Sequence, residues 1–373
     1  MKILIVSHEY PPIGGGGANA CKFLSREFVK RGHSVVVVTA GFESLNGIAE
    51  EDGYAIHRLP CKRKHREHCS FAEMSDYINR AMPYCAQLQN LAHFDVCMVF
   101  FGIPGGVVGR YLKSRFSLPY IIRFGGGDIP GFQERFKLIY KFVSPFVKNI
   151  WHHASALVAN SEGLKKFALD FCPKYPVQVV PNGVDTDFFS PEGSTVSDEG
   201  DEVRLLFVSR LIKRKGLQNL IPHLKDIEKA CGRRVTLTVV GDGPYRESLE
   251  NLCTFHDVED RVSFEGQKDK EEIPPYFSKA DIFVFPSSRE GMPNAVLEAM
   301  AGGLPVVMTP CEGAAELIDG NGIIAEEGEF YKSVIEAVKS GRLADMGRRS
   351  AKRARKEFSW GQTAEKYLEI MKL

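Results

Sequence analysis

I-F-V-F-P-S-S-R-E-G-M-P-N-A-V-L-E-A-M-A, residues 282 to 301, is the stretch that decides the fold. Its first part, Ile282–Phe285, is a short apolar run and predicts a buried strand. Pro293 and Asn294 are residues that often begin helices, and Ala295–Ala301 is rich in good helix formers. The stretch therefore predicts a strand, a loop and a helix. In such a unit the free N–H groups of the first helical turn lie at the end of the strand, where an anion is favoured.

Two carboxylates frame the start of this predicted helix, because Glu290 lies in the loop and Glu298 a turn inside the helix. A diphosphate at the helix end would place sugar hydroxyls near one carboxylate and a ribose near the other. Carboxylates accept hydrogen bonds from vicinal hydroxyls, so the pair suits a nucleotide-sugar clamp. The plainer interpretation is two acidic residues that only cap the helix or complement its dipole. Five residues at the start of the helix are also predicted to bind the nucleotide sugar: Gly291, Met292, Pro293, Asn294 and Ala295.

Short β-branched runs alternate with helical patterns on both sides of this stretch. In the first half the predicted strands are Ile3–Ser7, Ser34–Thr39, Val96–Phe101, Tyr120–Phe124, Ala156–Ala159 and Val177–Val180. In the second half they are Leu205–Ser209, Val235–Val240, Val262–Phe264, Ile282–Phe285 and Val306–Met308. Continuous apolar strands separated by helices indicate parallel sheets that are covered on both faces. Two such series predict an α/β protein with two Rossmann-like domains.

The domain boundary is predicted from composition. Residues 1–184 form the predicted N-terminal domain, and 203–356 the C-terminal one. Between them, 185–202 is rich in Gly, Ser, Asp and Glu and has few apolar residues, which is typical of a solvated linker. The last segment, 357–373, predicts a C-terminal helix that could pack on either domain.

A basic loop follows the first predicted strand of the second domain and contains Arg210 and Lys215. Ligands collect at the carboxyl ends of parallel strands. Two cations there can neutralise a diphosphate, most usefully as the nucleoside diphosphate leaves. A solvated basic turn is the alternative interpretation.

These motifs together resemble family 4 retaining glycosyltransferases over essentially the whole chain. The E-x7-E pair, Glu290 and Glu298, resembles the signature of that family, in which the first Glu binds the donor sugar and the second binds the ribose. The resemblance implies that Arg210 and Lys215 are the family's Arg/Lys pair. It also implies the GT-B fold, in which two Rossmann-like domains with parallel sheets face each other across a cleft. The N-terminal domain is then expected to bind the acceptor and the C-terminal domain the nucleotide sugar.

Two shorter segments add to the resemblance. The turn at Gly241 and Gly243 is a hallmark of the family, although its glycines can also serve only to let the backbone approach closely. Phe264 and Gly266 lie in a segment that resembles the one whose backbone reads the nucleotide base. Neither segment is specific alone, so contact with the donor and a purely structural role both remain open.

The first predicted strand is followed by four glycines that open a helix: Gly14, Gly15, Gly16 and Gly17. They expose backbone N–H groups, but they match neither a dinucleotide fingerprint nor a P-loop. The loop resembles the family's glycine-rich loop, which faces the acceptor and the donor phosphates; a plain turn is the alternative. Asp128 is retained from the family's Gly-x-Asp, whereas Gly125 stands where many members carry a His or Arg. This departure puts the acceptor side in doubt.

Composition limits the partners and the compartment. The formal net charge of +1 argues against a nucleic-acid binder. The nine cysteines are scattered without any C-x-x-C pair, which indicates free buried thiols in a reducing cytosol. No secretion signal or membrane-spanning segment is predicted. We therefore expect a cytoplasmic protein that could lie peripherally on the inner face of the membrane.

The first half of the chain is basic, with 22 Lys and Arg against 14 Asp and Glu over 1–180. Within it, 132–151 mixes six aromatics with cations, which suits an anionic membrane interface. The cations named in this segment are Arg135, Lys137, Lys141 and Lys148, and a second cluster contains Arg58, Lys62, Arg63, Lys64 and Arg66. The alternative is that the aromatics form core, Pro145 breaks the helix and the cations are a solvated face.

The function predicted from these features is transfer of a sugar from a UDP- or GDP-sugar to a glycan or lipid-linked acceptor, in polysaccharide or glycoconjugate synthesis. The resemblance implies retention of the anomeric configuration, with no cofactor and no metal. Alternatives are a nucleotide-sugar-binding protein, an inverting transferase or an epimerase-type GT-B enzyme with an altered acceptor site. The histidines show no spacing suited to a metal and are interpreted as structural.

Overall fold

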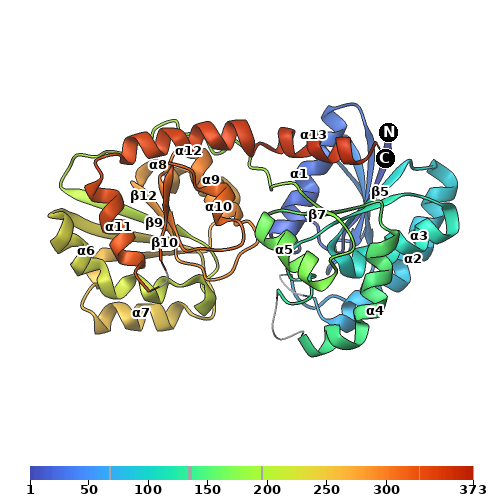
Figure 1. Cartoon of the computed structure of the whole chain (residues 1–373), viewed down its shortest axis with the longest axis horizontal. Coiled ribbons are helices and arrows are strands. Elements are labelled where there is room, and N and C mark those ends of the chain that lie inside the picture. Colours follow the sequence, from blue (N-terminus) through green and yellow to red (C-terminus); the bar gives the residue numbers. More distant parts are fainter. Residues whose placement is uncertain (67–68, 133–136, 195, 327, 373) are drawn as a thin grey trace. The chain divides into compact units, whose positions relative to one another are not determined.

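The computed structural model describes residues 1–66, 69–132, 137–194, 196–326 and 328–372. The chain divides into two compact units. The first unit comprises Met1–Asn182 together with Trp360–Leu373, and the second comprises Gly183–Ser359. Each unit is built on one sheet with helices packed against it (Figure 1).

The sheet of the first unit has the strand order β3-β4-β2-β1-β5-β6-β7-β8, and only β3 and β4 pair antiparallel. Its strands are β1 (Lys2–Val6), β2 (Ser34–Ala40), β3 (Gly47–Glu51), β4 (Tyr54–Leu59), β5 (Val96–Phe100), β6 (Tyr120–Arg123), β7 (Ala156–Ala159) and β8 (Val177–Val179). Its helices are α1 (Gly16–Lys30), α2 (Phe71–Ala92), α3 (Gly106–Phe116), α4 (Lys137–His153), α5 (Glu162–Phe171) and α13 (Trp360–Ile370).

The buried side chains of the first unit form one cluster on each face of this sheet. Ile3 and Ile5 of β1 belong to the cluster that contains α1 and α13, whereas Leu4 and Val6 belong to the cluster that contains α2, α3, α4 and α5. Successive side chains of a strand point to opposite faces, so a continuous apolar strand is stabilised from both sides. This explains why the buried runs of the sequence predict the strands well.

The second unit repeats the arrangement with six parallel strands in the order β11-β10-β9-β12-β13-β14. The strands are β9 (Glu202–Val208), β10 (Arg234–Val240), β11 (Val262–Gly266), β12 (Ile282–Phe285), β13 (Val306–Met308) and β14 (Gly322–Ile324). The helices are α6 (Leu224–Cys231), α7 (Arg246–Phe255), α8 (Pro274–Lys279), α9 (Asn294–Ala301), α10 (Ala314–Leu317), α11 (Phe330–Lys339) and α12 (Leu343–Glu357). The prediction of two α/β units with parallel sheets is confirmed.

The segment 185–202, predicted as a linker, belongs to the second unit. Phe189 is buried and packs edge-on against Phe277 with ring centroids 5.8 Å apart. Further along, Asp198 accepts a hydrogen bond from the N–H of Leu343 (2.6 Å) at the start of α12. The polar composition of the segment therefore reflects its exposed surface, while Phe189 anchors it to the core of that unit.

The last helix, α13, belongs to the first unit and lies beside α1 (Figure 1). The rings of Trp360 and Phe23 stack with centroids 5.3 Å apart, and Arg31 donates a hydrogen bond to the carbonyl of Gly361 (3.0 Å). The chain therefore passes between the units twice, after Asn182 and after Ser359.

Three strands were not predicted from the sequence. β3 is mostly exposed and polar, and it turns back into β4 through Asp52 and Gly53, both at positive φ. A two-residue turn of this kind matches the twist of a hairpin. β14 has only three residues and ends exposed. β3 and β14 therefore lack the buried apolar run on which the other predictions rest, whereas β4 is mostly buried but carries His57 and Arg58 within its run.

Two further predictions can be compared with the structure. All nine cysteines are free thiols, as predicted, and most of them are buried. Within the described residues, no helix combines the length and the apolar character needed to cross a bilayer.

Candidate functional site

The loop between β12 and α9 holds Glu290 at the start of a helix. β12 ends at Phe285, and α9 begins at Asn294 directly after Pro293. Proline fixes φ and needs no hydrogen bond at its nitrogen, which suits the residue before a helix. The predicted strand, loop and helix are therefore confirmed as local structure.

The segment after β13 supports this loop from the side. The N–H of Glu290 donates to Glu312 Oε2 (3.1 Å), and the N–H of Glu312 donates to the carbonyl of Glu290 (3.1 Å). A Cβ at Gly313 would lie 3.2 Å from Met292 Cα, so glycine permits the close approach of the two segments. Glu290 is thus positioned by backbone contacts as well as by its side chain.

The carboxylate of Glu290 has one anchored oxygen. Oε1 accepts hydrogen bonds from Ser287 Oγ (2.9 Å) and Arg214 Nη1 (2.9 Å) and forms an ion pair with Lys215 Nζ (2.8 Å), and the side chain is 16% exposed. Within the described part of the chain, Oε2 accepts no hydrogen bond. A carboxylate can accept about four hydrogen bonds, so Oε2 keeps its capacity for a ligand hydroxyl.

Lys215 lies in a tight basic turn, Lys213–Lys215, that packs against the end of β12. Gly216 closes the turn at φ +80°, and a Cβ there would lie 2.8 Å from the carbonyl carbon of Pro286. The ammonium of Lys215 lies 4.9 Å from the centre of the Phe285 ring. Burial lowers the pKa of Lys215, and the neighbouring Glu290 carboxylate acts in the opposite direction.

The sequence predicts Arg210 and Lys215 as the two cations of the site. The structure brings Lys215 and Arg214 to Glu290, whereas Arg210 is exposed after the end of β9. The charge of Arg210 is nevertheless among the causes, after burial, that lower the pKa of Lys215. Arg214 had no predicted role, although its place in the run Lys213–Lys215 is a signal that could have found it.

Gly241 and Gly243 shape the loop that carries Arg210. Both have positive φ, and a Cβ at Gly241 would lie 2.9 Å from the carbonyl carbon of Ser209. The N–H of Leu211 donates to the carbonyl of the intervening residue, Asp242 (2.8 Å). The close backbone approach that the sequence left open is therefore present, and it positions Arg210.

Phe264 and Gly266 lie at the end of β11, next to this turn. The N–H of Gly241 donates to the carbonyl of Gly266 (2.8 Å), which itself has φ +73°. The guanidinium of Arg246 lies 5.8 Å from the centre of the Phe264 ring. A backbone hydrogen bond thus joins the carboxyl ends of β10 and β11.

Glu298 lies on α9 as predicted, and its carboxyl group is perturbed. Burial raises its pKa from 4.5 to about 7, with Lys270 acting in the opposite direction. No side-chain hydrogen bond to Glu298 is present among the described residues. A half-buried carboxyl group with a raised pKa is a functional-site candidate on physical grounds.

The four glycines of the first unit have different surroundings. Gly14 has φ +92°, and its N–H donates to the carbonyl of Arg66 (2.8 Å). Gly15 has open space where a Cβ would be, and Gly16 is the first residue of α1. The prediction that this loop opens a helix is confirmed.

Asp128 is buried and uses both carboxylate oxygens inside the protein. Oδ2 accepts from the N–H of Gly102 (2.6 Å), and Oδ1 accepts from the N–H of Gly125 (2.8 Å). Burial raises the pKa of Asp128, while these two N–H groups act in the opposite direction. Asp128 therefore holds the loops after β5 and β6 together.

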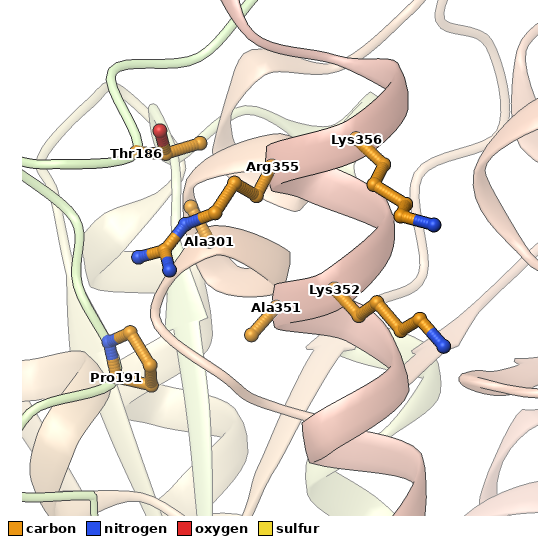
Figure 2. Close-up of a pocket in the computed structure, with 7 residues that line it drawn as sticks. All are labelled: Thr186, Pro191, Ala301, Ala351, Lys352, Arg355 and Lys356. Carbon is orange, nitrogen blue, oxygen red and sulfur yellow. The ribbon is translucent and has the colours of Figure 1, made fainter.

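A shallow pocket of about 290 Å³ lies at the opposite end of α9, where Ala301 ends the helix. Figure 2 shows Arg355 of α12 reaching across it, while Lys352 and Lys356 point away. The candidate site lies instead at Asn294, where α9 begins.

The sequence matches two models of known protein families. The model described as Glycosyltransferase Family 4 matches residues 14–188, and the model described as Glycosyl transferases group 1 matches residues 202–340. The chain belongs to the family 4 glycosyltransferases. The family that its motifs resemble is therefore confirmed, and with it the activity class of glycosyltransferase.

Three similar proteins illustrate the relationship. An uncharacterized glycosyltransferase of Methanocaldococcus jannaschii is 26% identical and covers 96% of this family 4 chain and 95% of its own. A GDP-mannose-dependent alpha-(1-6)-phosphatidylinositol monomannoside mannosyltransferase of Mycolicibacterium smegmatis is 27% identical. The match covers 94% of this chain and 91% of the mannosyltransferase. The solved structure of Anabaena HepE in complex with UDP superposes with a TM-score of 0.74 at 19% identity and covers all of both chains. The GT-B fold of this family 4 glycosyltransferase is thereby confirmed.

Proposed function

We propose that this glycosyltransferase moves a sugar from a nucleotide-diphosphate sugar to a glycan or lipid-linked acceptor, and that the second unit binds the donor. The observation that carries the proposal is the Glu290 carboxylate, whose Oε1 is anchored by two cations and a serine hydroxyl while Oε2 accepts no hydrogen bond in the described chain. In this proposal Oε2 accepts from hydroxyls of the donor sugar and orients the anomeric carbon.

The donor diphosphate would bind where positive charge converges. Lys215 and the exposed Arg210 supply cations, and the N-terminus of α9 at Asn294 supplies the positive end of a helix dipole. Phosphate oxygens accept from such groups in charge-assisted hydrogen bonds. Glu298 would then accept from the ribose hydroxyls in its ionised form.

Transfer would proceed with retention and without a metal ion. The acceptor hydroxyl attacks the anomeric carbon from the side on which the diphosphate departs, and a leaving phosphate oxygen takes its proton. Lys215 and Arg210 stabilise the charge that accumulates on the diphosphate as the bond to the sugar breaks. Because every group is held before the reaction, positioning and electrostatics supply most of the rate gain.

The donor base is proposed to be uracil or guanine. The mannosyltransferase relative is GDP-mannose-dependent by name, and HepE was solved with UDP. A thermal-shift panel of UDP, GDP, ADP and their sugars tests this choice. A ligand present at a hundred times its dissociation constant stabilises the folded state by about 2.7 kcal/mol, which is readily measured.

The alternatives are a nucleotide-sugar-binding protein and an epimerase-type GT-B enzyme. NMR of the sugar released from the bound donor in the absence of acceptor separates them from the proposal. Release with the original anomeric configuration supports a retaining transferase. Binding without any release supports a binding protein, and a sugar with altered ring stereochemistry supports an epimerase.

The raised pKa of Glu298 predicts a pH-dependent stability. Between about 4.5 and about 7 the unfolded chain ionises this group while the folded chain keeps its proton. The contribution of Glu298 to the free energy of unfolding therefore falls as the pH rises through this window and stays low above it. We expect Glu298→Gln to raise Tm relative to the unsubstituted protein more at pH 8 than at pH 5.5, as measured by calorimetry without ligand. Equal shifts at the two pH values would contradict the assignment.

A lipid-linked acceptor requires access to a membrane, and α4 carries a surface that suits one. Phe142 and Phe146 are 82% and 52% exposed, and the exposed Lys141 and Lys148 accompany them on the helix. Pro145 lies within α4 and does not end it. The interpretation of the aromatics as core therefore holds for Trp151, which is buried, but not for Phe142 and Phe146.

Three of the basic residues named from the sequence add no described charge to this surface. Arg135 lies outside the described residues, as does the side chain of Lys137. Arg63, from the second basic cluster, is buried and donates to backbone carbonyls, including that of His8 (3.1 Å). Arg63 therefore stabilises the fold, and the remaining cations around it provide the surface charge.

We expect the protein to sediment with anionic vesicles at low salt and to be released at high salt, because attraction to anionic headgroups is screened by ions. Phe142→Ser combined with Phe146→Ser should lower vesicle binding at least threefold at low salt. Phe255→Ser on α7 is the matched control, since Phe255 is also 82% exposed. Equal binding by all three proteins, or no binding at any salt, would favour a soluble acceptor.

A further inference from the structure

Phe101 has an unusual backbone conformation for a bulky residue. It follows β5 directly, begins an irregular turn (Phe101–Gly105), and has φ +70°. Positive φ is a genuine outlier for such a side chain and persists only where the surroundings impose it. Its ring is half-buried. The sequence predicts Phe101 as the last residue of a strand, so this feature was not foreseen.

Two glycines from other segments, one in α1 and one after β6, make room for this ring. A Cβ at Gly17, in the first turn of α1, would lie 2.6 Å from Cζ of Phe101. A Cβ at Gly125, after β6, would lie 2.6 Å from Cδ1 of the same ring. Real Cβ atoms do not approach so closely, so any larger residue at either position would displace the ring. The Phe101 ring occupies the space that a side chain at Gly125 would take.

Two polar residues complete the frame. The Asp128 carboxylate accepts hydrogen bonds from two N–H groups. One belongs to Gly102, which follows Phe101, and the other to Gly125, which lies against the Phe101 ring. His8, after β1, meets the ring edge-on with centroids 4.9 Å apart. The buried Nδ1 of His8 has no hydrogen-bond partner in the described part of the chain. An unsatisfied polar atom beside the ring distinguishes this place from an ordinary apolar core.

The Phe101 ring lies at the carboxyl end of β5, and ligands of α/β sheets bind at the carboxyl ends of strands. β1, β5 and β6 are adjacent parallel strands, and the loops at their carboxyl ends carry His8, Phe101 and Gly125. Ligands of open α/β sheets bind outside these ends. The face of an aromatic ring is electronegative and attracts polarised C–H groups, such as those on one side of a pyranose.

We propose that Phe101 is a specificity-determining residue of the first unit, and that its ring is the platform on which a sugar ring of the acceptor stacks. This rests on the proposed function, because it presupposes that the first unit binds the acceptor. The chain thereby replaces a polar side chain at position 125 with an apolar aromatic face. We expect preference for an acceptor whose terminal sugar presents an apolar C–H face.

The test uses methyl α- and β-glycosides of glucose, galactose, mannose and N-acetylglucosamine as acceptor probes. Their binding is measured by saturation-transfer NMR on the full protein in the presence of saturating UDP or GDP. Phe101→Leu keeps an apolar side chain but removes the ring face, and we expect at least tenfold weaker binding of the preferred glycoside. Phe101→His restores a planar ring on a residue that tolerates positive φ, and it should recover most of the affinity.

Calorimetry of UDP or GDP binding and Tm separate this role from a purely structural one. We expect Phe101→Leu to retain the nucleotide affinity and a Tm close to that of the unsubstituted protein. Joint loss of glycoside binding, nucleotide binding and Tm would show that the ring only fills space, and this would overturn the proposal. Unchanged glycoside binding in Phe101→Leu, or no binding to the unsubstituted protein, would also overturn it. Failure of the proposed function would appear separately, as absence of nucleotide binding.

Discussion

Replacing Glu290 by glutamine should lower the rate of sugar transfer by roughly a hundredfold to a thousandfold, the effect of losing one positioned electrostatic contact at a reacting centre. The substitution keeps the side-chain volume but removes the charge that pairs with Lys215 and Arg214. Both cations would then be drawn toward the diphosphate, and the donor sugar would lose its acceptor oxygen at Oε2. Turnover of the nucleotide sugar at saturating donor measures the loss.

Nucleotide binding separates this effect from a general loss of structure. Because Glu290 is proposed to contact the sugar, Glu290→Gln should bind UDP or GDP at least as tightly as the unsubstituted protein does. Glu329→Gln is the matched control, since Glu329 is a surface carboxylate of the same unit that pairs with Lys332. A Glu290→Gln protein with unaltered turnover would show that the donor sugar binds elsewhere.

The fold could be predicted wherever apolar residues run continuously through a strand. Ile282–Phe285 and Val306–Met308 have the predicted bounds because both faces of these strands are buried. β3 was not predicted, because its residues are mostly exposed and its pairing depends on the turn at Asp52 and Gly53. The packing of 185–202 on the second unit was also not predicted, because it depends on one buried residue, Phe189, in a segment that is otherwise mostly polar.

The candidate site could be predicted where its parts are close in sequence. Glu290 and the start of α9 lie within a few residues of each other, so the strand, loop and helix pattern predicts their arrangement. Glu312 and Arg214 contact Glu290 from segments 22 and 76 residues away. No local pattern links these residues, and only the pairing of the strands brings their loops together.

Gly125 illustrates the limit of a resemblance more sharply. The sequence shows that a side chain is missing there, but it does not show what takes its place. The answer lies 24 residues earlier, in a Phe101 whose backbone conformation no propensity would favour. The space left by a side chain missing from a family pattern can therefore be filled by a residue from a neighbouring strand. Gly125 alone is weak support for a decayed acceptor site.

Replacing Lys215 by methionine should lower turnover by roughly tenfold to a thousandfold at saturating donor, as expected for one positioned cation at a leaving group. Methionine keeps an unbranched apolar side chain but removes the ammonium, which lies 4.9 Å from the centre of the Phe285 ring and 2.8 Å from Glu290 Oε1. Glu290 would remain held by Arg214 and Ser287, so its position should change little. The loss would then report chiefly on charge at the diphosphate.

Arg210→Ala provides an independent measurement of the same charge. Arg210 is exposed and does not depend on Glu290 for its position, because the turn at Gly241 and Gly243 holds its loop. Its removal should also slow turnover at least tenfold. Lys225→Met is the control, since Lys225 is a cation of the same unit that pairs with Asp257 on the surface. If Lys215→Met and Arg210→Ala both kept the full rate, the diphosphate would have to bind away from the loop after β9, and Glu290 would lose its proposed role with it.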